Sequence, residues 1–316
     1  MTDADLSALQ VGWIGTGRMG LPLARRLLAA GVPTSAWNRT RAKAEPLAAE
    51  GATVVDRIAE LAGRDVVFTM VAADADLEQV VLGPEGLLSD PERRPDVIVD
   101  CSTVSAETSA RIRSAVAERG ADFIAAPVSG NGKVVQAGKL SLVCSGAEAA
   151  FERVRHLLDL LGQHVTYAGE GENARLVKIC HNLMLGIVAQ TMAEITVLAE
   201  KGGVSRAAFL DFLNNSVMGS TFSRYKSPAY VNLDFTPTFT PVLLRKDFDL
   251  GLAAAREMGV PMPVAALTHA LIQSAVSQGR TEEDFAVLLE LQATNSGLHL
   301  KPEDVEVDDG LSDGAG

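Results

Sequence analysis

The sequence predicts an α/β domain with a doubly wound, mainly parallel sheet, joined by a long helix to an all-α domain. From about residue 10 to 165, short apolar runs alternate with helical patterns, which is typical of a parallel sheet with helices on both faces. After Gly171 only helical patterns continue. We therefore expect an α/β domain over residues 1–170, a helical domain over 171–300 and a tail over 301–316.

Each element of the first domain follows from its local pattern. Short apolar runs predict strands, and amphipathic segments between them, several ending at glycine, predict helices. The strands are expected at 11–15, 34–37, 65–71, 96–101, 121–127, 140–144 and 164–168. The helices are expected at 20–31, 42–51, 75–83, 106–120 and 148–162.

One long helix, 173–203, opens the second domain and is apolar almost all round. Its polar interruptions argue against a membrane helix, and a helix apolar on most faces is usually buried between layers or subunits. Four further helices are expected at 206–215, 244–259, 263–279 and 282–294.

Composition excludes several classes of protein. No apolar run approaches the ~20 residues of a membrane span, and the acidic start "MTDADLSALQ" lacks a signal-peptide pattern. Cys101, Cys144 and Cys180 share no metal-like spacing, which predicts buried thiols, no metal and a cytoplasmic protein. The net charge of −12 argues against nucleic-acid binding. Six acidic residues and no basic residue follow Lys301, and we expect this tail to be disordered.

The stretch "GWIGTGRMG" places Gly15, Gly17 and Gly20 between the first strand and the first helix. In that context the G-x-G-x-x-G spacing predicts a dinucleotide-binding turn of a Rossmann-type domain, with the phosphates at the helix N-terminus. The intervening residues Thr16, Arg18 and Met19 are then expected to contact the cofactor. A plain tight turn is the alternative.

The second strand ends in "WNRT", where folds that select NAD usually place an acid. Asn38 stands there instead, followed by Arg39 and Thr40. A carboxylate would repel a 2′-phosphate, whereas an arginine offers it a planar fork. The sequence therefore favours NADP, with NAD as a possibility, and a solvated basic turn is the alternative.

Three further stretches carry candidate chemistry. "DCST" ends a predicted strand at Thr103, and the loop "PVSGNGK" could bind a carboxylate through Ser129 and its backbone N–H groups. In the long helix, Lys178 and Asn182 are four residues apart and share a face. From the residues alone, Lys178 could be an acid/base group, a structural salt bridge or a snorkelling lysine.

Together these motifs resemble the β-hydroxyacid dehydrogenase family, which includes 3-hydroxyisobutyrate dehydrogenase and semialdehyde reductases. The resemblance runs from about residue 10 to 298. It rests on motifs in the family order, which are the glycine turn with Met19, "DCST", "PVSG", Lys178 with Asn182, Gly219–Ser220 and "RKDFDLGLA" at 245–253.

The resemblance implies roles for the matching residues. Lys178 would be the general acid/base, and Asn182 would hold the substrate and help to fix Lys178. Ser129 and Gly130 would bind a carboxylate or similar anion on a small-molecule substrate. Thr103 would contact the nicotinamide end of the cofactor, and Lys246 would close over it from the helical half. Family members also form dimers or tetramers through their helical halves, so we expect a homo-oligomer.

The sequence departs from the family pattern at three places. Asn131 replaces the second glycine after "PVS", and His181 replaces the first of two asparagines that follow the lysine. Val71, expected at the cofactor, stands in place of a leucine. Asn131 and His181 could contact an additional polar group of the substrate, or His181 could have only a packing role.

Two other functions remain open at this point. An imine reductase would share the fold, although such relatives generally lack the lysine. A non-catalytic NADP-binding regulator would keep the glycine turn without needing Lys178. 6-Phosphogluconate dehydrogenase is a more distant relative with a longer helical portion.

Overall fold

The computed structural model describes residues 8–311 of the 316-residue chain. The chain divides into two compact units, Met1–Lys178 and Ile179–Gly316. The first is an α/β unit and the second is entirely helical among its described residues, which confirms the expected fold class.

The α/β unit is built on a six-stranded sheet in the order β3-β2-β1-β4-β5-β6, with every described pairing parallel. Because β1 and β4 are neighbours, the order of the strands reverses between them, which is where ligands bind in folds of this type. The strands are β1 (Val11–Ile14), β2 (Thr34–Trp37), β3 (Thr53–Val54), β4 (Val66–Thr69), β5 (Val97–Asp100) and β6 (Asp122–Ala125).

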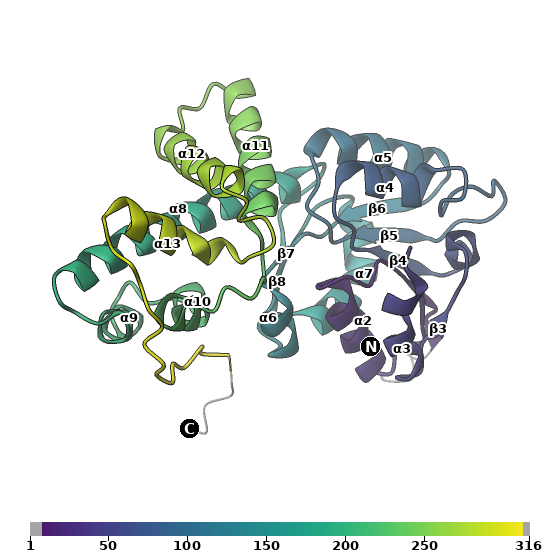
Figure 1. Ribbon diagram of the computed structural model, residues 1–316. Helices are drawn as coiled ribbons and strands as arrows, with labels where there is room; N and C mark the ends of the chain where they lie inside the picture. The colour runs from purple at the N-terminus through teal and green to yellow at the C-terminus, as the bar shows by residue number, and fades with distance from the viewer. Residues whose placement is uncertain (1–7, 312–316) are drawn as a thin grey trace. The chain divides into compact units, whose positions relative to one another are not determined.

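Helices cover both faces of this sheet (Figure 1). Alternate residues of each strand point to opposite faces, so Trp13 and Phe68 belong to one core cluster while Ile14 and Val67 belong to another. The first cluster is closed by α2 (Gly20–Ala29) and α7 (Glu148–Leu161), and the second by α4 (Asp74–Leu82) and α5 (Ala106–Glu118). The unit also contains three short elements, η1 (Arg41–Lys43), α3 (Glu45–Ala48) and η2 (Ile58–Leu61).

A second, three-stranded sheet was not expected. It contains β7 (Val128–Ser129), β8 (Ser141–Cys144) and β9 (His164–Tyr167), with β7 antiparallel and β9 parallel to β8. The runs 140–144 and 164–168 are therefore strands as predicted, but they do not extend the main sheet. The chain continues from β6 into β7, because Ala125 bridges Ser145 in the same antiparallel register in which Val128 pairs with Leu142. It reverses direction only after β7, through the short α6 (Gly132–Gln136), and returns as β8.

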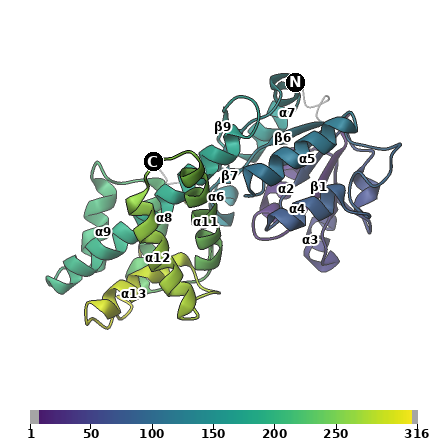
Figure 2. The same cartoon turned by 90° about the horizontal axis from the view of Figure 1, so that it is seen from above.

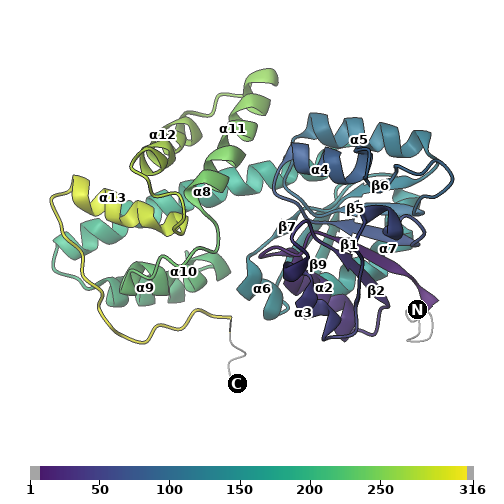
Figure 3. The ribbon, with the colours of Figure 1, turned by 45° about the vertical axis from the view of Figure 1, so that its right-hand side comes forward.

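The helical unit is organised around α8 (Asn173–Lys201), the long helix that the sequence predicted. Figures 2 and 3 show α9 (Arg206–Asn215) on one side of it and α11 (Pro241–Glu257), α12 (Pro263–Ser277) and α13 (Leu288–Asn295) on the other. Helix α11 packs closely against α8, because a Cβ added to Gly186 of α8 would come within 2.4 Å of the Phe248 ring of α11. The short η3 (Phe285–Val287) precedes α13.

Helix α10 (Thr221–Asn232) lies where no helix was expected. It contains Pro228 and ends at Leu233, which adopts a left-handed conformation (φ 56°) that usually requires glycine. Ser220 caps its N-terminus by accepting a hydrogen bond from the Ser223 backbone N–H. Tertiary contacts therefore maintain a helix that local sequence signals disfavour, including a bond from Tyr230 Oη to the Ala189 carbonyl of α8.

Helix α8 is less buried than its composition suggested. By length and composition it could cross a membrane, and half of its most apolar window is buried within the structure. Met184 and Leu198 are 67% and 69% exposed. Burial within the single chain therefore holds for one side of the helix, and burial of the other side between subunits stays a prediction.

Residues 301–311, within the stretch for which disorder is expected, form hydrogen bonds with the helical unit. The Glu303 carboxylate accepts hydrogen bonds from the backbone N–H groups of Arg206 and Ala207, and Arg206 donates to the Lys301 carbonyl. Asn232 donates to the Val305 carbonyl at 2.9 Å. The acidic side chain of Glu303 is therefore used as an acceptor. Residues 312–316 lie outside the described part of the chain.

Candidate functional site

Most of the candidate cofactor residues lie at the carboxyl edge of the six-stranded sheet. The glycine turn follows β1, Asn38 follows β2, Val71 follows β4 and Thr103 follows β5. Because all these strands are parallel, their carboxyl ends meet at one edge, on both sides of the point where the strand order reverses.

The glycines of the turn have different structural requirements. Gly15 adopts φ +94°, and a Cβ there would come within 2.2 Å of the Met70 carbonyl oxygen. A Cβ on Gly20 would come within 1.9 Å of the Gly15 carbonyl oxygen, which also accepts a 2.9 Å bond from Trp13 Nε1. Gly17 is exposed, and a Cβ on it would meet no atom within 4 Å. The fold thus requires Gly15 and Gly20, while only a ligand would require Gly17.

The N-terminus of α2 is suited to a phosphate. Met19 occupies its N-cap position without a side-chain hydrogen bond, and the first turn contains no acidic residue. The helix dipole therefore favours an anion at this end. Thr16 Oγ1 is buried and has no hydrogen-bond partner among the described residues. An orphaned hydroxyl, an uncapped helix start and open space at Gly17 together fit the diphosphate of a dinucleotide.

Asn38 holds the turn from the neighbouring strand. Its Oδ1 accepts a 2.9 Å bond from the Thr16 backbone N–H, and its Nδ2 donates to the Thr40 carbonyl. Arg39 is 79% exposed at its side chain and lies 3.2 Å from the Asp76 carboxylate. Arg39 is thus a surface side chain in an ion pair that solvent screens, and only its Nη1 contacts Asp76.

A buried network at the ends of β4 and β5 was not anticipated. Arg175, in the first turn of α8, is 1% exposed and forms an ion pair with Asp100, which is 0% exposed, at 2.6 Å. Ser102 Oγ donates to Asp100 and accepts a 2.8 Å bond from the Val71 backbone N–H. The available sequence signals were an aspartate that ends an apolar strand and an arginine three residues before Lys178.

The segment "PVSGNG" approaches the glycine turn, since a Cβ on Gly132 would lie 3.3 Å from the Arg18 carbonyl oxygen. Gly130 adopts φ +134° and is crowded by Val134, so it is needed for the fold as well. Asn131 is buried and caps α6, because its Oδ1 accepts from the Val134 backbone N–H at 3.1 Å. This departure from the family pattern therefore has a local structural use. Ser129 lies in β7.

The other candidate residues lie on α8 and α11. Lys178 is partly buried and lies one turn before Asn182, which is 3% exposed. Asn182 Nδ2 donates to Asp247 Oδ2 at 2.5 Å, and its Oδ1 lies 2.9 Å from His181 Nδ1. Lys246 Nζ lies 3.3 Å from Asp247 Oδ1. One carboxylate, that of Asp247, thus connects Asn182 and Lys246, which are both candidate site residues.

The cysteines do not offer a nucleophile at this edge. Burial, reinforced by Asp100, raises the pKa of the Cys101 thiol well above its ordinary value, and burial raises that of Cys144 to about 12. Both thiols therefore stay protonated. Cys180 is exposed, so the prediction that all three are buried is wrong.

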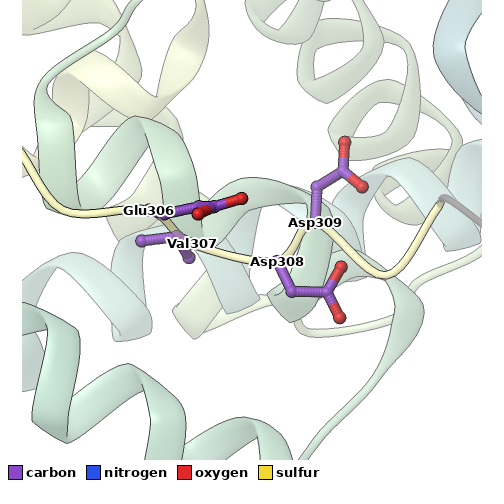
Figure 4. A pocket seen from close by; sticks show the side chains of 4 residues that line it. All are labelled: Glu306, Val307, Asp308 and Asp309. Carbon is purple, nitrogen blue, oxygen red and sulfur yellow. The ribbon is translucent and has the colours of Figure 1, made fainter. Parts of the chain in front are cut away.

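Two other features do not provide a substrate site. A surface hollow is lined by the consecutive residues Glu306–Asp309, whose three carboxylates would repel an anionic substrate (Figure 4). Within residues 8–311, no cluster of three or more His, Cys, Asp or Glu side chains could hold a metal ion.

Two family models cover most of the chain. The model of the NAD binding domain of 6-phosphogluconate dehydrogenase matches residues 10–169, and that described as NAD-binding of NADP-dependent 3-hydroxyisobutyrate dehydrogenase matches residues 171–292. The chain is 30% identical to 2-(hydroxymethyl)glutarate dehydrogenase of Eubacterium barkeri, over 92% of this chain and 97% of that protein.

Solved structures agree with these matches. The structure of 3-hydroxyisobutyrate dehydrogenase from Salmonella typhimurium has a TM-score of 0.82 at 27% identity, covering 90% of this chain and 99% of that chain. Psf3 in complex with NADP+ and 2-OPP has a TM-score of 0.80 at 28% identity, covering 89% and 99%. An imine reductase from Myxococcus stipitatus shares the fold alone, with a TM-score of 0.58 at 24% identity, covering 89% and 99%. The chain therefore belongs to the β-hydroxyacid dehydrogenase family, as a NAD(P)-dependent dehydrogenase of the 3-hydroxyisobutyrate dehydrogenase type.

Proposed function

We propose that the protein interconverts a small 3-hydroxy acid and its semialdehyde with NADP(H), in the cytoplasm, and that Lys178 is the general acid/base. The bound dinucleotide supplies or accepts the hydride. The observation that carries the proposal is the pairing on α8 of Lys178 with Asn182, one turn apart, because the amide of Asn182 is held by Asp247 at 2.5 Å. A fixed amide beside an ammonium group suits the positioning of a hydroxyl or carbonyl oxygen.

Each residue has a stated task in this proposal. In reduction, the Lys178 ammonium donates its proton to the substrate carbonyl oxygen, and in oxidation the neutral amine accepts the proton of the hydroxyl. Asn182 orients the oxygen, and Ser129 with the Gly130 backbone binds the carboxylate. Gly17 and the start of α2 hold the phosphates, while Lys246 and Thr103 contact the cofactor. Relatives named for 2-(hydroxymethyl)glutarate and 3-hydroxyisobutyrate support the substrate class.

NADP is the preferred cofactor in this proposal. Asn38 places no carboxylate at the end of β2, where one would repel a 2′-phosphate, and Arg39 and Thr40 follow at the surface. Psf3, which is similar over 89% of this chain, is a structure with NADP+.

The test is a paired screen for oxidation and reduction. Small 3-hydroxy acids, their semialdehydes and cyclic imines are each assayed with NADP(H) and NAD(H). We expect turnover of hydroxy acids or semialdehydes with NADP(H), and a loss of ~10²–10⁴-fold in Lys178→Met, the usual range for an acid/base residue. NADPH affinity should be unchanged in that variant. Lys201→Met, which changes an exposed lysine of α8, is the control.

Each outcome of the screen has a clear meaning. Turnover of imines alone would establish a different reaction on the same fold. NADPH binding without turnover of any compound would support the regulatory alternative.

We also propose that the protein is a homo-oligomer. Large apolar side chains are exposed on the helical unit, including Leu198 at 69%, Phe212 at 72% and Met218 at 71%. Exposed apolar groups of this size are typical of interaction surfaces. Light scattering coupled to size-exclusion chromatography measures the mass, and a mass of 33.3 kDa would contradict the proposal.

A further inference from the structure

The guanidinium group of Arg175 donates hydrogen bonds to three groups of the α/β unit. Its Nη2 donates to Asp100 Oδ2 at 2.6 Å, its Nη1 donates to the Ser102 carbonyl at 2.6 Å, and its Nε donates to Ser109 Oγ at 3.1 Å. Asp100 ends β5 and Ser109 lies in α5. A single side chain of α8 is thus tied to a strand end, the loop after it and the following helix.

The same network reaches the neighbouring strand. Asp100 Oδ1 accepts bonds from Thr69 Oγ1 at 2.6 Å and from Ser102 Oγ at 2.7 Å. Ser102 Oγ in turn accepts from the Val71 backbone N–H at 2.8 Å. The ends of β4 and β5, and the loops that carry Val71 and Thr103, are therefore held in the same set of bonds as α8.

Stability alone is a weak explanation for this arrangement. A buried ion pair must overcome a large desolvation cost, and replacing one with apolar side chains is often neutral or stabilising. A planar guanidinium with three directed bonds does provide fixed geometry. Arg206 is a second buried arginine in the chain and can be compared with Arg175. It is 1% exposed, pairs with Glu200 and donates to backbone carbonyls within the helical unit.

Helix geometry transmits this anchor to Lys178. Lys178 follows Arg175 by three positions, which corresponds to about 4.5 Å along the helix axis and about 60° around it. The same turn is held at two more points. Arg113 binds the Glu172 carboxylate at 2.8 Å, and Ser145 Oγ accepts from the Ala174 backbone N–H at 3.0 Å.

We propose that Arg175 is a positioning residue for Lys178, which fixes the start of α8 against the carboxyl ends of β4 and β5 and so sets the position of the acid/base group relative to the cofactor edge. This inference rests on the proposed function, because it assigns Arg175 a part in the reaction of Lys178. Arg175 itself acts only through the network and does not touch the reacting atoms.

The test compares Arg175→Lys with Arg206→Lys. Both variants remove a buried guanidinium and keep its charge, so both lose stability. We expect kcat to fall about 10–100-fold in Arg175→Lys, since a displacement of about 1 Å can cost that much, with KM for NADPH within about threefold. We expect kcat within about twofold of the parent in Arg206→Lys. The deuterium isotope effect with 4-deuterated NADPH should rise only in the Arg175 variant, because hydride transfer becomes slower.

A second readout needs no cofactor. Hydrogen exchange of the backbone amides of residues 173–182 should be about tenfold faster in Arg175→Lys and unchanged in Arg206→Lys, because the anchor lies in that turn. The double variant Arg175→Met with Asp100→Asn removes both buried charges. We expect it to recover stability relative to Arg175→Met alone while kcat stays low.

Recovery of kcat in the double variant would overturn the inference, because Arg175 would then only neutralise Asp100. Equal losses of kcat in the two lysine variants would also overturn it. Arg175→Lys keeps a cation opposite Asp100, so it carries the test even if Arg175→Met does not fold. An inactive parent enzyme would instead contradict the proposed function, whereas an active parent with an inactive Lys178→Met leaves only the role of Arg175 in question.

Discussion

Asn182 Nδ2 donates to Asp247 Oδ2 at 2.5 Å, and both side chains are almost completely buried. The bond joins α8 to α11 and orients an amide that, in the proposed reaction, faces the substrate oxygen. Because Asp247 can only accept hydrogen bonds when ionised, the amide nitrogen must face it, and the amide oxygen faces His181 Nδ1 at 2.9 Å. His181 therefore helps to fix Asn182.

This geometry predicts opposite responses to two substitutions of Asn182. Asn182→Ala leaves Asp247 without its donor and should cost about 1–3 kcal/mol of unfolding free energy, with little dependence on pH. Asn182→Asp places a second carboxyl group against Asp247, which raises the pKa of the introduced group. Its neutral form can still donate, so Asn182→Asp should be more stable at pH 5 than at pH 8. Urea unfolding at both pH values measures this, and identical behaviour of the two variants would show that the bond is unimportant.

A second prediction separates the roles of two glycines. Gly15→Ala should destabilise the fold strongly, because φ is +94° and the new Cβ would meet the Met70 carbonyl oxygen at 2.2 Å. Gly17→Ala meets no atom within 4 Å, so its melting temperature should stay close to that of the parent. If the diphosphate lies over Gly17, the added methyl group should weaken NADPH binding by about tenfold or more. Thermal melts measure the stability of each variant, and fluorescence titration measures its NADPH affinity. Unchanged affinity in Gly17→Ala would place the phosphates elsewhere.

Sequence alone predicted the elements whose signals are local. The glycine turn was recognisable because Gly15, Gly17 and Gly20 lie within six positions between a strand and a helix. Helix α8 was recognisable because its apolar pattern continues over 29 residues. Lys178 and Asn182 were placed on one face because helical spacing alone determines that.

The remaining features depend on contacts that sequence spacing does not encode. Arg175 and Asp100 are 75 positions apart, and nothing in either local pattern indicates the partner. The strands β8 and β9 have ordinary strand patterns, and nothing in those patterns indicates that β8 pairs antiparallel with β7 in a second sheet. Asn131 is predicted to contact the substrate because it departs from the family pattern, and that departure does not indicate that its Oδ1 also caps α6.

Asn38 provides a prediction about the cofactor. Asn38→Asp keeps an acceptor for the Thr16 N–H group, which now bonds to Oδ1 at 2.9 Å, so the turn should persist. The added negative charge should weaken NADPH binding by at least about tenfold, or about 1.4 kcal/mol, through repulsion of the 2′-phosphate, and leave NADH binding nearly unchanged. Fluorescence titrations measure the dissociation constants of NADPH and NADH, and their ratio gives the selectivity. Equal weakening of both cofactors would indicate damage to the turn rather than a change in selectivity.

The pair of Lys226 and Asp284 predicts how the helical unit responds to acid. The two side chains are 3% and 1% exposed, and the Lys226 ammonium lies 2.5 Å from the carboxylate and 4.3 Å from the centre of the Phe285 ring. Burial alone would raise the pKa of Asp284, but Lys226 and the hydrogen bonds from Thr238 and the Ala286 backbone outweigh it and hold the pKa below 3.8. The pair therefore stabilises the fold above about pH 4, and this stabilisation is lost as the pH falls through the lowered value.

Removing the cation should reverse that dependence. In Lys226→Met the buried Asp284 lacks its partner, so we expect a loss of about 3–5 kcal/mol at pH 7. Burial then raises the pKa of Asp284, and the deficit relative to the parent should shrink as the pH falls toward 4, because the neutral acid is easier to bury. Lys301→Met, at an exposed lysine of the same unit, should change stability by less than about 0.5 kcal/mol at every pH. Urea unfolding followed by circular dichroism between pH 4 and 7 gives the three curves, and a deficit in Lys226→Met that stays constant with pH would mean that the ion pair does not control the charge state of Asp284.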